Sequence, residues 1–367
     1  MKNFITDNLT PSSRPRLVLL ALIYIAIAHL SRHYNKLIHT HCYGEIIRNE
    51  CRGHKFKQDN VMHMCLAFTY VAVAKAIMMI MDQMPNIENK IESKPPKLLF
   101  WFIGTGIVLS LTFSQLGKEQ TTYSIFTAFT SSLPLIVLIS CLILSKKIYE
   151  VQKYFIVMSI IFGLFWHLND YKSGSGNVLG VVYMILSVLI FGATQGLTER
   201  VRMSKSPSTL NYIMWINLFA GPIYVIPIII YDESFDFFVL SVENLDVYFD
   251  IAIMALYGFI MTFISYLIVV EYGVLTAVIL YAARDVFVTI NEKIIDGSIL
   301  TVDDQMNNVK WIGFGILMVG LVSDLILGDQ KFCEHHKDDG EVELANATEL
   351  QTLNSNNNEN NKDDEKE

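Results

Sequence analysis

Ten apolar segments, most of them about 20 residues long, follow one another along this chain, and a helix of about that length crosses a bilayer. They lie at roughly 17–38, 60–81, 98–116, 121–145, 154–169, 178–200, 210–231, 247–270, 274–295 and 309–328. Of the 367 residues, 52% are hydrophobic and 17% are charged, which is too apolar for an ordinary soluble protein. The segments therefore predict an all-α membrane protein with ten transmembrane helices.

The net charge of −8 belongs to the end of the chain. Residues 329–367 carry 12 acidic and 4 basic side chains, which leaves 24 charges of each sign in the rest. This stretch has few apolar residues, so we expect an acidic, disordered tail. The acidity gives no information about what the membrane-embedded part binds.

Short basic loops indicate the orientation of a membrane protein, because such loops stay in the cytosol. The loops at 145–153 and 199–205 are basic, whereas the loop at 232–246 is acidic. The first two are therefore predicted to be cytosolic. An even number of spans then places both termini in the cytosol, including the segment 1–16. The basic loop at 48–57 disagrees, and the later loops outweigh it.

The two halves of the chain resemble each other at an offset of 157 residues. Lys153 precedes Gly163 by ten residues in the fifth segment, and Lys310 precedes Gly320 by ten residues in the tenth. Five spans per half require the two copies, 17–169 and 170–328, to insert in opposite senses. The pattern predicts two inverted five-helix repeats, as in secondary transporters.

Two charged side chains interrupt the ninth segment. Arg284 lies about 15 Å of helix rise from either end, and a charge at that depth needs a partner or a water-lined cavity. Asp285 is a poor partner, because adjacent residues do not face each other on a helix. Tyr281 shares the face of Arg284, and the pair suits a nucleotide, since the ring stacks on a base and the guanidinium binds phosphate. Alternatively, Arg284 pairs with a structural carboxylate such as Glu199 or Glu271.

Other polar positions admit two interpretations. Lys75 interrupts the second segment and either lines a cavity or extends to the membrane surface. Lys36 ends the first segment, where an interface role is the default. Ser131 belongs to a row of hydroxyl side chains at 121–132, which is typical of close helix packing. The histidines are interpreted as helix-end residues rather than ligands. The cysteines of the first loop are either bridged or free.

Sequence motifs for catalysis or metal binding are not found. The chain has no GxSxG, HExxH, paired CxxC or GxxxxGK[ST] pattern, and its five cysteines lack the spacing of metal ligands. We therefore expect no enzyme activity, no cofactor and no nucleic-acid partner.

Several segments, in this order along the chain, resemble the nucleotide-sugar transporters of the drug/metabolite transporter superfamily. More narrowly, the sequence resembles the UDP-galactose transporter-like branch, subfamily B of solute carrier family 35. The segments that carry it are NKLIHTHCYGE (35–45), AVAKAI (72–77), GATQGLTERVR (192–202), NYIMWINL (211–218), VVEYGVLTAVILYAARDVFVTI (269–290) and KWIGFGILMVGL (310–321).

The sequence departs from the family pattern at four positions. The family has two lysines in the fourth span, where this chain has Ala128 and Ser131. Asp285 replaces the lysine that follows the ninth-span arginine, and Phe191 replaces an aspartate. Three basic positions are lost from the side that the resemblance assigns to phosphate.

The resemblance implies an antiporter of the Golgi or endoplasmic reticulum membrane, and it is compatible with a homo-oligomer. It would exchange a cytosolic nucleotide-sugar, such as UDP-galactose or UDP-glucose, for a lumenal nucleotide monophosphate. Exchange of ATP and ADP or of adenosine phosphosulfate, and a non-transporting interaction protein of the same fold, are the alternatives. The residues expected at the substrate are Arg284, Tyr281, Lys75, Lys36, Asp285, Glu199, Ser131 and Asn217.

Overall fold

The structure is a computed structural model. It describes residues 14–40, 46–47, 50–51, 59–82, 97–168, 177–205, 207–231, 233, 246–295 and 308–327. The helices are α2 (Arg14–Thr40), α3 (Asp59–Asp82), α4 (Lys97–Gln120), α5 (Tyr123–Ser131), α6 (Leu133–Leu144), α7 (Val151–Leu168), α8 (Val178–Lys205), α9 (Thr209–Ile223), α10 (Val225–Ile230), α12 (Asp246–Tyr272), α13 (Val274–Ile295) and α14 (Asn308–Leu327). Two short strands, β1 (Ile46–Ile47) and β2 (Glu50–Cys51), pair antiparallel. Residues 327–367 belong to a separate unit, and the expected disordered tail lies outside the described residues.

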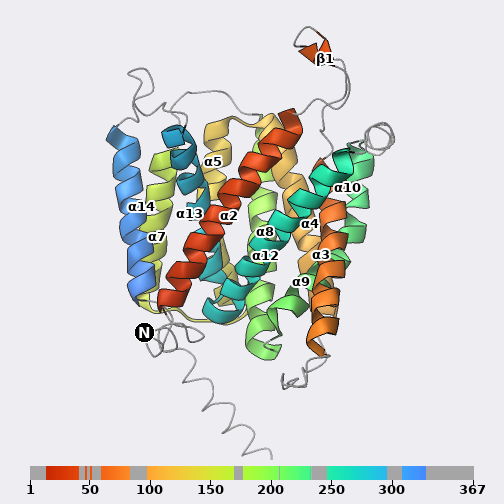
Figure 1. The fold of residues 1–367 in the computed structure, drawn as a ribbon. Helices are drawn as coiled ribbons and strands as arrows, with labels where there is room; N and C mark the ends of the chain where they lie inside the picture. Colours follow the sequence, from red (N-terminus) through yellow and green to blue (C-terminus); the bar gives the residue numbers. More distant parts are fainter. Residues whose placement is uncertain are drawn as a thin grey trace, which may run out of the picture. The chain divides into compact units, whose positions relative to one another are not determined.

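The described helices coincide with the apolar segments of the sequence (Figure 1). Two segments correspond to a pair of helices, α5 with α6 and α9 with α10. Within the described ranges, six helical stretches are long and apolar enough to cross a membrane: Arg14–Arg32, Asn60–Asp82, Lys97–Gln120, Val178–Ser204, Thr209–Ile230 and Val247–Tyr272. Shorter apolar helices accompany them at Leu133–Leu144, Val151–Trp166, Val274–Arg284 and Ile312–Asp324. These lengths and compositions agree with the predicted helical membrane protein.

Successive helices run back and forth between two ends of the bundle (Figure 1). At the lower end in that view, α8 ends and α13 begins, and we call it the Glu199 face. At the upper end, α3 begins and α4 ends, and we call it the Asn60 face. The two names are used below to locate cavities and ion pairs along the helices.

The fourth apolar segment is divided into two helices at Ser132. Ser132 has φ −80° and ψ −9°, and its hydroxyl donates to the Phe129 carbonyl oxygen at 2.7 Å. Pro134 follows at the second position of α6, where its missing N–H costs no helical hydrogen bond. The break places Ser131 and Leu133 where the two helices meet.

A single residue, Gly273, joins α12 to α13. Its φ of +95° lies in the left-handed region that residues other than glycine rarely adopt. Its amide donates to the Val269 carbonyl oxygen at 3.0 Å, which closes the end of α12. The apolar segments leave only residues 271–273 between the eighth and ninth spans, and the structure places the turn at Gly273.

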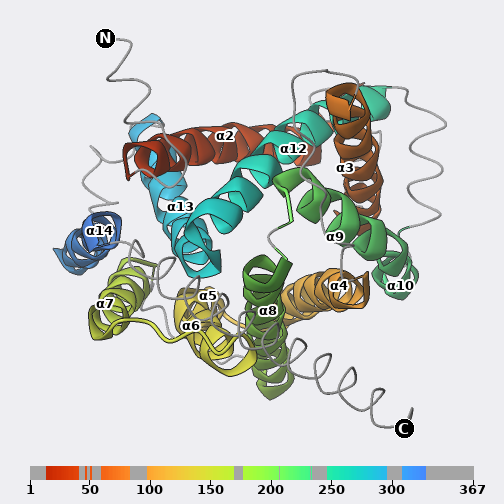
Figure 2. The same cartoon turned by 90° about the horizontal axis from the view of Figure 1, so that it is seen from below.

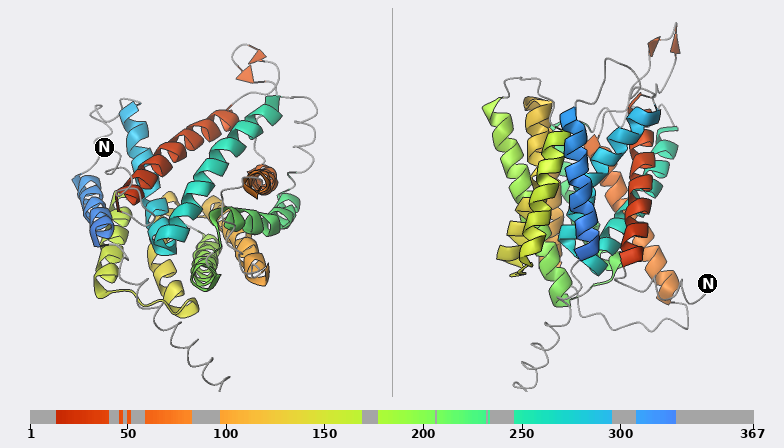
Figure 3. Two further views of the ribbon diagram at one scale, coloured as in Figure 1. Left: turned by 60° about the horizontal axis from the view of Figure 1, so that its bottom comes forward. Right: turned by 90° about the vertical axis from the view of Figure 1, so that its left-hand side faces the viewer.

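The helices pack in pairs that come from the two halves of the chain. α4 lies along α8, α3 along α9, and α2 along α12, as the views in Figures 2 and 3 show. α6 packs against both α8 and α13. Segments that are far apart in sequence therefore form the interior of the bundle.

α7 and α14 meet through glycines that lie 157 positions apart. A Cβ atom built on Gly163 would lie 2.5 Å from the Leu317 nitrogen and 2.8 Å from the Gly313 carbonyl oxygen. A Cβ atom built on Gly320 would lie 3.4 Å from the Ile160 nitrogen and 3.6 Å from the Ile156 carbonyl oxygen. The two helices thus approach at backbone distance, which only small side chains allow.

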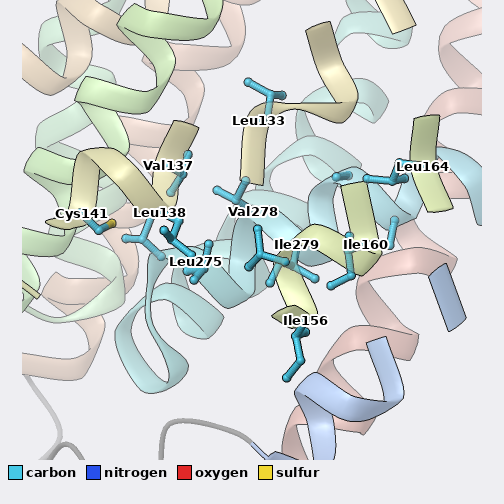
Figure 4. Close-up of a cluster of buried hydrophobic side chains, with 14 of the residues drawn as sticks. Leu133, Val137, Leu138, Cys141, Ile156, Ile160, Leu164, Leu275, Val278 and Ile279 are labelled. Carbon is cyan, nitrogen blue, oxygen red and sulfur yellow. The ribbon is translucent and has the colours of Figure 1, made fainter. Parts of the chain in front are cut away.

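The largest buried apolar cluster lies where α6, α7 and α13 meet (Figure 4). We call it the α6–α7–α13 core. The members labelled in Figure 4 are Leu133, Val137, Leu138, Cys141, Ile156, Ile160, Leu164, Leu275, Val278 and Ile279.

Candidate functional site

Arg284 lies over the ring of Tyr281, one turn earlier on α13. The guanidinium carbon is 4.3 Å from the ring centroid, a distance at which a cation is attracted to the ring face. Arg284 is half-buried, and Tyr281 is 37% exposed. The helical spacing predicted that these side chains share a face, and the structure brings them into contact.

Tyr281 also lines a cavity of about 140 Å³ between α4, α5, α6, α7, α8 and α13. We call it the hydroxyl cavity after five of its lining residues, which are Ser110, Ser114, Thr130, Ser131 and Ser187. Ser131, which was expected at the substrate, is therefore brought together with Tyr281. Hydroxyl groups can both donate and accept hydrogen bonds, so the wall suits a polar ligand such as ribose.

Two of these hydroxyls also hold helices together. Ser110 donates to the Ser187 carbonyl oxygen at 3.0 Å, and Ser187 donates to the Ser110 carbonyl oxygen at 2.8 Å. This reciprocal pair joins α4 to α8. Close packing was expected of the hydroxyl row at 121–132, to which neither serine belongs, and Ser131 of that row lies on the cavity wall.

Asn217 lines a second cavity of about 190 Å³, between α3, α4, α9 and α12. We call it the tyrosine cavity after Tyr70, Tyr224 and Tyr266, which line it with His63, Thr262 and Asn217. Aromatic ring faces and an amide can bind a planar, hydrogen-bonding group.

His63 stacks on Tyr224 in the wall of the tyrosine cavity, with ring centroids 5.7 Å apart and an interplanar angle of 23°. The sequence interpretation treated His63 only as a helix-end residue and overlooked the three tyrosines. The sequence does contain a sign of this cavity. His63 and Tyr70 are seven residues apart in one segment, and Asn217 and Tyr224 are seven residues apart in another, so each pair shares a helix face. Pairing those segments required the three-dimensional structure.

Glu199 is fully buried in an ion cluster at the end of α8. Its Oε1 accepts from the Lys147 ammonium at 3.1 Å and from the Arg202 guanidinium at 2.6 Å. Its Oε2 accepts from the Arg202 Nε at 3.1 Å and from the Val274 amide at 3.0 Å. The two carboxylates suggested as structural partners of Arg284 thus bind other cations, since Glu271 pairs with Arg16 at 2.6 Å.

Lys147 is a functional candidate that the sequence did not single out. It was one of several lysines in a basic loop, yet it is only 3% exposed. The preceding residue, Lys146, has φ +54°, and the Lys147 amide donates a hydrogen bond to the Cys141 carbonyl oxygen at 3.3 Å. The side chain thereby enters the bundle and reaches Glu199.

The remaining predicted residues lie elsewhere or outside the described side chains. Lys75 is exposed on α3, on the face that it shares with Ala72 and Met79, and it does not line the hydroxyl or the tyrosine cavity. Lys36 lies in α2 and Asp285 in α13, but both side chains are outside the described part of the structure.

Among the described residues, no three His, Cys, Asp or Glu side chains are grouped as they would be to hold a metal ion. The polar groups that surround the two cavities are hydroxyls, one amide and one imidazole. They can bind a polar organic ligand without a metal.

Comparison with known proteins gives relatives of low identity. The chain is 21% identical over 228 residues to the solute carrier family 35 member B1 homolog of Drosophila melanogaster, which covers 60% of this chain and 65% of that protein. It is 23% identical over 200 residues to solute carrier family 35 member B1 of Xenopus laevis, covering 53% and 61%. The chain thus spans less than two thirds of these relatives' length. No protein-family model matches the sequence.

A solved crystal structure shares the fold. The superposition has a TM-score of 0.56 and covers 87% of this chain and 99% of the other, at 12% sequence identity. At that identity the likeness shows a common fold alone.

Proposed function

We propose that the chain is a nucleotide-sugar antiporter of subfamily B of solute carrier family 35, the subfamily that its relatives support. It exchanges a cytosolic UDP-sugar, such as UDP-galactose or UDP-glucose, for a lumenal nucleotide monophosphate. The membrane is that of the Golgi or endoplasmic reticulum, with both termini in the cytosol. The relatives and the apolar helices support a membrane-integral transporter, and the substrates follow from the family resemblance.

The observation that carries the proposal is the contact of Arg284 with a cavity-lining tyrosine. A guanidinium in the middle of an apolar helix is costly, and binding an anion offsets that cost. Tyr281 joins Arg284 to the hydroxyl cavity, because its ring carries the guanidinium on one face and lines the cavity. A phosphate that enters the cavity beside Tyr281 can bind the guanidinium in bidentate geometry.

The cavity walls supply the remaining contacts of the proposed substrate. We assign the ribose and base to Tyr281 and to the hydroxyl side chains that include Ser131. Asn217 offers an amide in the tyrosine cavity, which also borders α4. In the conformation described here, the assignment thus depends on Arg284, Tyr281, Ser131 and Asn217.

Two inverted repeats of five helices are part of the proposal. The α7–α14 contact supports them, because it is reciprocal at a constant offset of 157 positions. Gly163 of α7 approaches Leu317 and Gly313 of α14. The residues at the equivalent positions of the other half make the same contact, because Gly320 of α14 approaches Ile160 and Ile156 of α7. A two-fold axis between equivalent helices produces this exchange of partners. Inverted repeats of this kind place a substrate at the midplane.

Charge explains why such a carrier exchanges substrates. With the cavity empty, the Arg284 site lacks the phosphate of the substrate, and in the proposed cycle the protein then reorients poorly. A nucleotide bound at either face neutralises the site and permits the transition, because a ligand shifts an equilibrium by its differential affinity. Transport of one nucleotide is then coupled to return of another.

Substitution of Arg284 tests the proposal. We expect Arg284→Ala to abolish counterflow of labelled UDP-sugar into proteoliposomes that are preloaded with UMP, while the purified protein stays folded. Arg200→Ala is the matched control, because Arg200 is an exposed arginine on α8. Normal counterflow by Arg284→Ala would remove the proposed role of this residue.

A non-transporting protein of the same fold is a second candidate. Ala128 and Ser131 occupy the positions of two family lysines, which leaves fewer cations for a polyphosphate. Thermal stability in detergent separates the candidates, since a ligand that binds only the folded state raises the denaturation midpoint. A transporter is stabilised by at least one nucleotide of a panel, and a scaffold is stabilised by none.

A further inference from the structure

The hydroxyl cavity lies in the half of the bundle next to the Asn60 face. α8 begins at that face, and the hydroxyl cavity contacts it between Met184 and Phe191, in its first half. The tyrosine cavity contacts α3 between His63 and Tyr70, near that face, and α12 at Thr262 and Tyr266, nearer the other end. The hydroxyl cavity is thus displaced from the Glu199 face.

The half next to the Glu199 face is filled with apolar side chains below the hydroxyl cavity. Leu133 and Leu164 line that cavity and belong to the α6–α7–α13 core. From there the core continues to Val278 and Leu275, which are 4% and 1% exposed (Figure 4). Leu275 directly follows Val274, whose amide binds Glu199.

Glu199 joins three segments at the end of this core. Its two oxygens bind Lys147 from the loop after α6, Arg202 from α8 and the first amide of α13. The carboxylate thus neutralises two cations and also faces a helix N-terminus, where a negative charge is favourable. The α12–α13 turn packs on the cluster, since a Cβ on Gly273 would lie 3.5 to 3.6 Å from atoms of all three charged side chains.

Two further ion pairs lie at the Glu199 face. Arg16 of α2 binds Glu271 at the end of α12 at 2.6 Å. Lys153 at the start of α7 pairs with Asp324 near the end of α14, and both side chains are buried. The Glu199 cluster and these two ion pairs together connect most of the described helices that begin or end at this face.

We propose that Glu199 is a latch that keeps the Glu199 face closed. The Lys147–Glu199–Arg202 cluster holds the start of α13 against α8 and the loop after α6. It opens when the hydroxyl cavity becomes accessible from that face. The inference rests on the proposed function, since a latch of this kind acts in a protein that alternates between two faces. Removing the carboxylate leaves Lys147, Arg202 and the N-terminus of α13 without their shared anion, which favours separation of the segments.

Cys141 provides a reporter that needs no substrate. It is fully buried in the α6–α7–α13 core, on the last turns of α6 next to the cluster. The experiment uses the full chain with Cys42, Cys51, Cys65 and Cys333 replaced by serine, reconstituted in liposomes, and a membrane-impermeant maleimide. We expect Glu199→Gln to increase the rate of Cys141 labelling from the Glu199 face roughly tenfold, as for a tenfold larger open population.

Two further variants make the test decisive. Lys147→Met removes one arm of the cluster and leaves Arg202 and the Val274 amide on Glu199, so it increases labelling by a smaller factor. Lys146→Gln removes the neighbouring exposed charge and leaves the rate unchanged. Folding is checked by gel filtration and the thermal denaturation midpoint. If the Glu199→Gln protein does not fold, the labelling rate of Lys147→Met alone tests the latch.

Unchanged labelling in the folded variants overturns the latch, even where nucleotide counterflow is normal. Faster labelling in a protein that carries out no nucleotide exchange supports the latch and removes the proposed substrates instead. The two failures are therefore distinguishable.

Discussion

Glu233 caps the start of α3 through the backbone and side chain of Asn60. Its Oε2 accepts from the Asn60 and Val61 amides at 2.9 and 3.0 Å, and its Oε1 accepts from the Asn60 side-chain amide at 2.7 Å. The first amides of a helix have no partner within the helix, and a carboxylate there also stabilises the helix dipole. Glu233 follows α10, so this contact ties the two segments together at the Asn60 face.

We expect Glu233→Ala to destabilise the protein by about 1–3 kcal/mol, because buried donors lose their acceptor. The readout is a lower thermal denaturation midpoint in detergent. Glu119→Ala serves as the control, since Glu119 is exposed at the end of α4. Equal midpoints for the two variants would show that the cap contributes nothing to stability.

Tyr281 is predicted to act on substrate binding through its ring. Tyr281→Phe keeps a ring under the Arg284 guanidinium and should bind nucleotide nearly as the parent does. Tyr281→Leu removes a cation–ring contact of about 0.5–2 kcal/mol, so we expect nucleotide affinity to fall by roughly 2- to 30-fold. Isothermal titration or ligand-dependent thermal shifts measure the difference. Phe155→Leu, on an exposed position of α7, should change nothing, and equal affinities of Tyr281→Phe and Tyr281→Leu would contradict the role of the ring.

The α7–α14 contact predicts opposite effects of the same substitution at two glycines. Gly163→Ala places a methyl group against the α14 backbone and should cost about 1–3 kcal/mol, as overpacking does. Gly315→Ala meets nothing within 4 Å and should be neutral, or stabilising by up to about 1 kcal/mol through helix propensity. Thermal denaturation of both variants checks this. A Gly163→Ala protein as stable as Gly315→Ala would show that α7 and α14 do not approach so closely.

Features that depend on local pattern could be predicted from the sequence. The helices coincide with the apolar segments because helix length is set by the thickness of the bilayer. The contact of Tyr281 with Arg284 follows from their spacing of three residues on one helix. The short turn at 271–273 was local as well, whereas the break at Ser132 was not predicted, because 121–145 was expected to form one span.

Features that depend on long-range packing could not be predicted. Lys147 and Glu199 are 52 positions apart, and the burial of Lys147 depends on the path of a loop in which Lys146 has a left-handed conformation. This burial also weakens the prediction that the loop at 145–153 is cytosolic. Lys147 and Lys153 were counted as exposed loop charges, whereas both are buried and paired with carboxylates. The pairing of Arg202 with Glu199 could have been predicted from the sequence, because residues three apart are neighbours on a helix surface.

Nucleotide exchange by the unmodified protein tests the central claim most directly. Purified protein is reconstituted into liposomes, preloaded either with UMP or with buffer, and uptake of labelled UDP-galactose and UDP-glucose is measured against competing ATP, ADP and adenosine phosphosulfate. The account predicts uptake of a UDP-sugar that depends on internal UMP and is abolished in Arg284→Ala. Uptake that is equal in preloaded and empty liposomes, or no uptake of any nucleotide by folded protein, would contradict it.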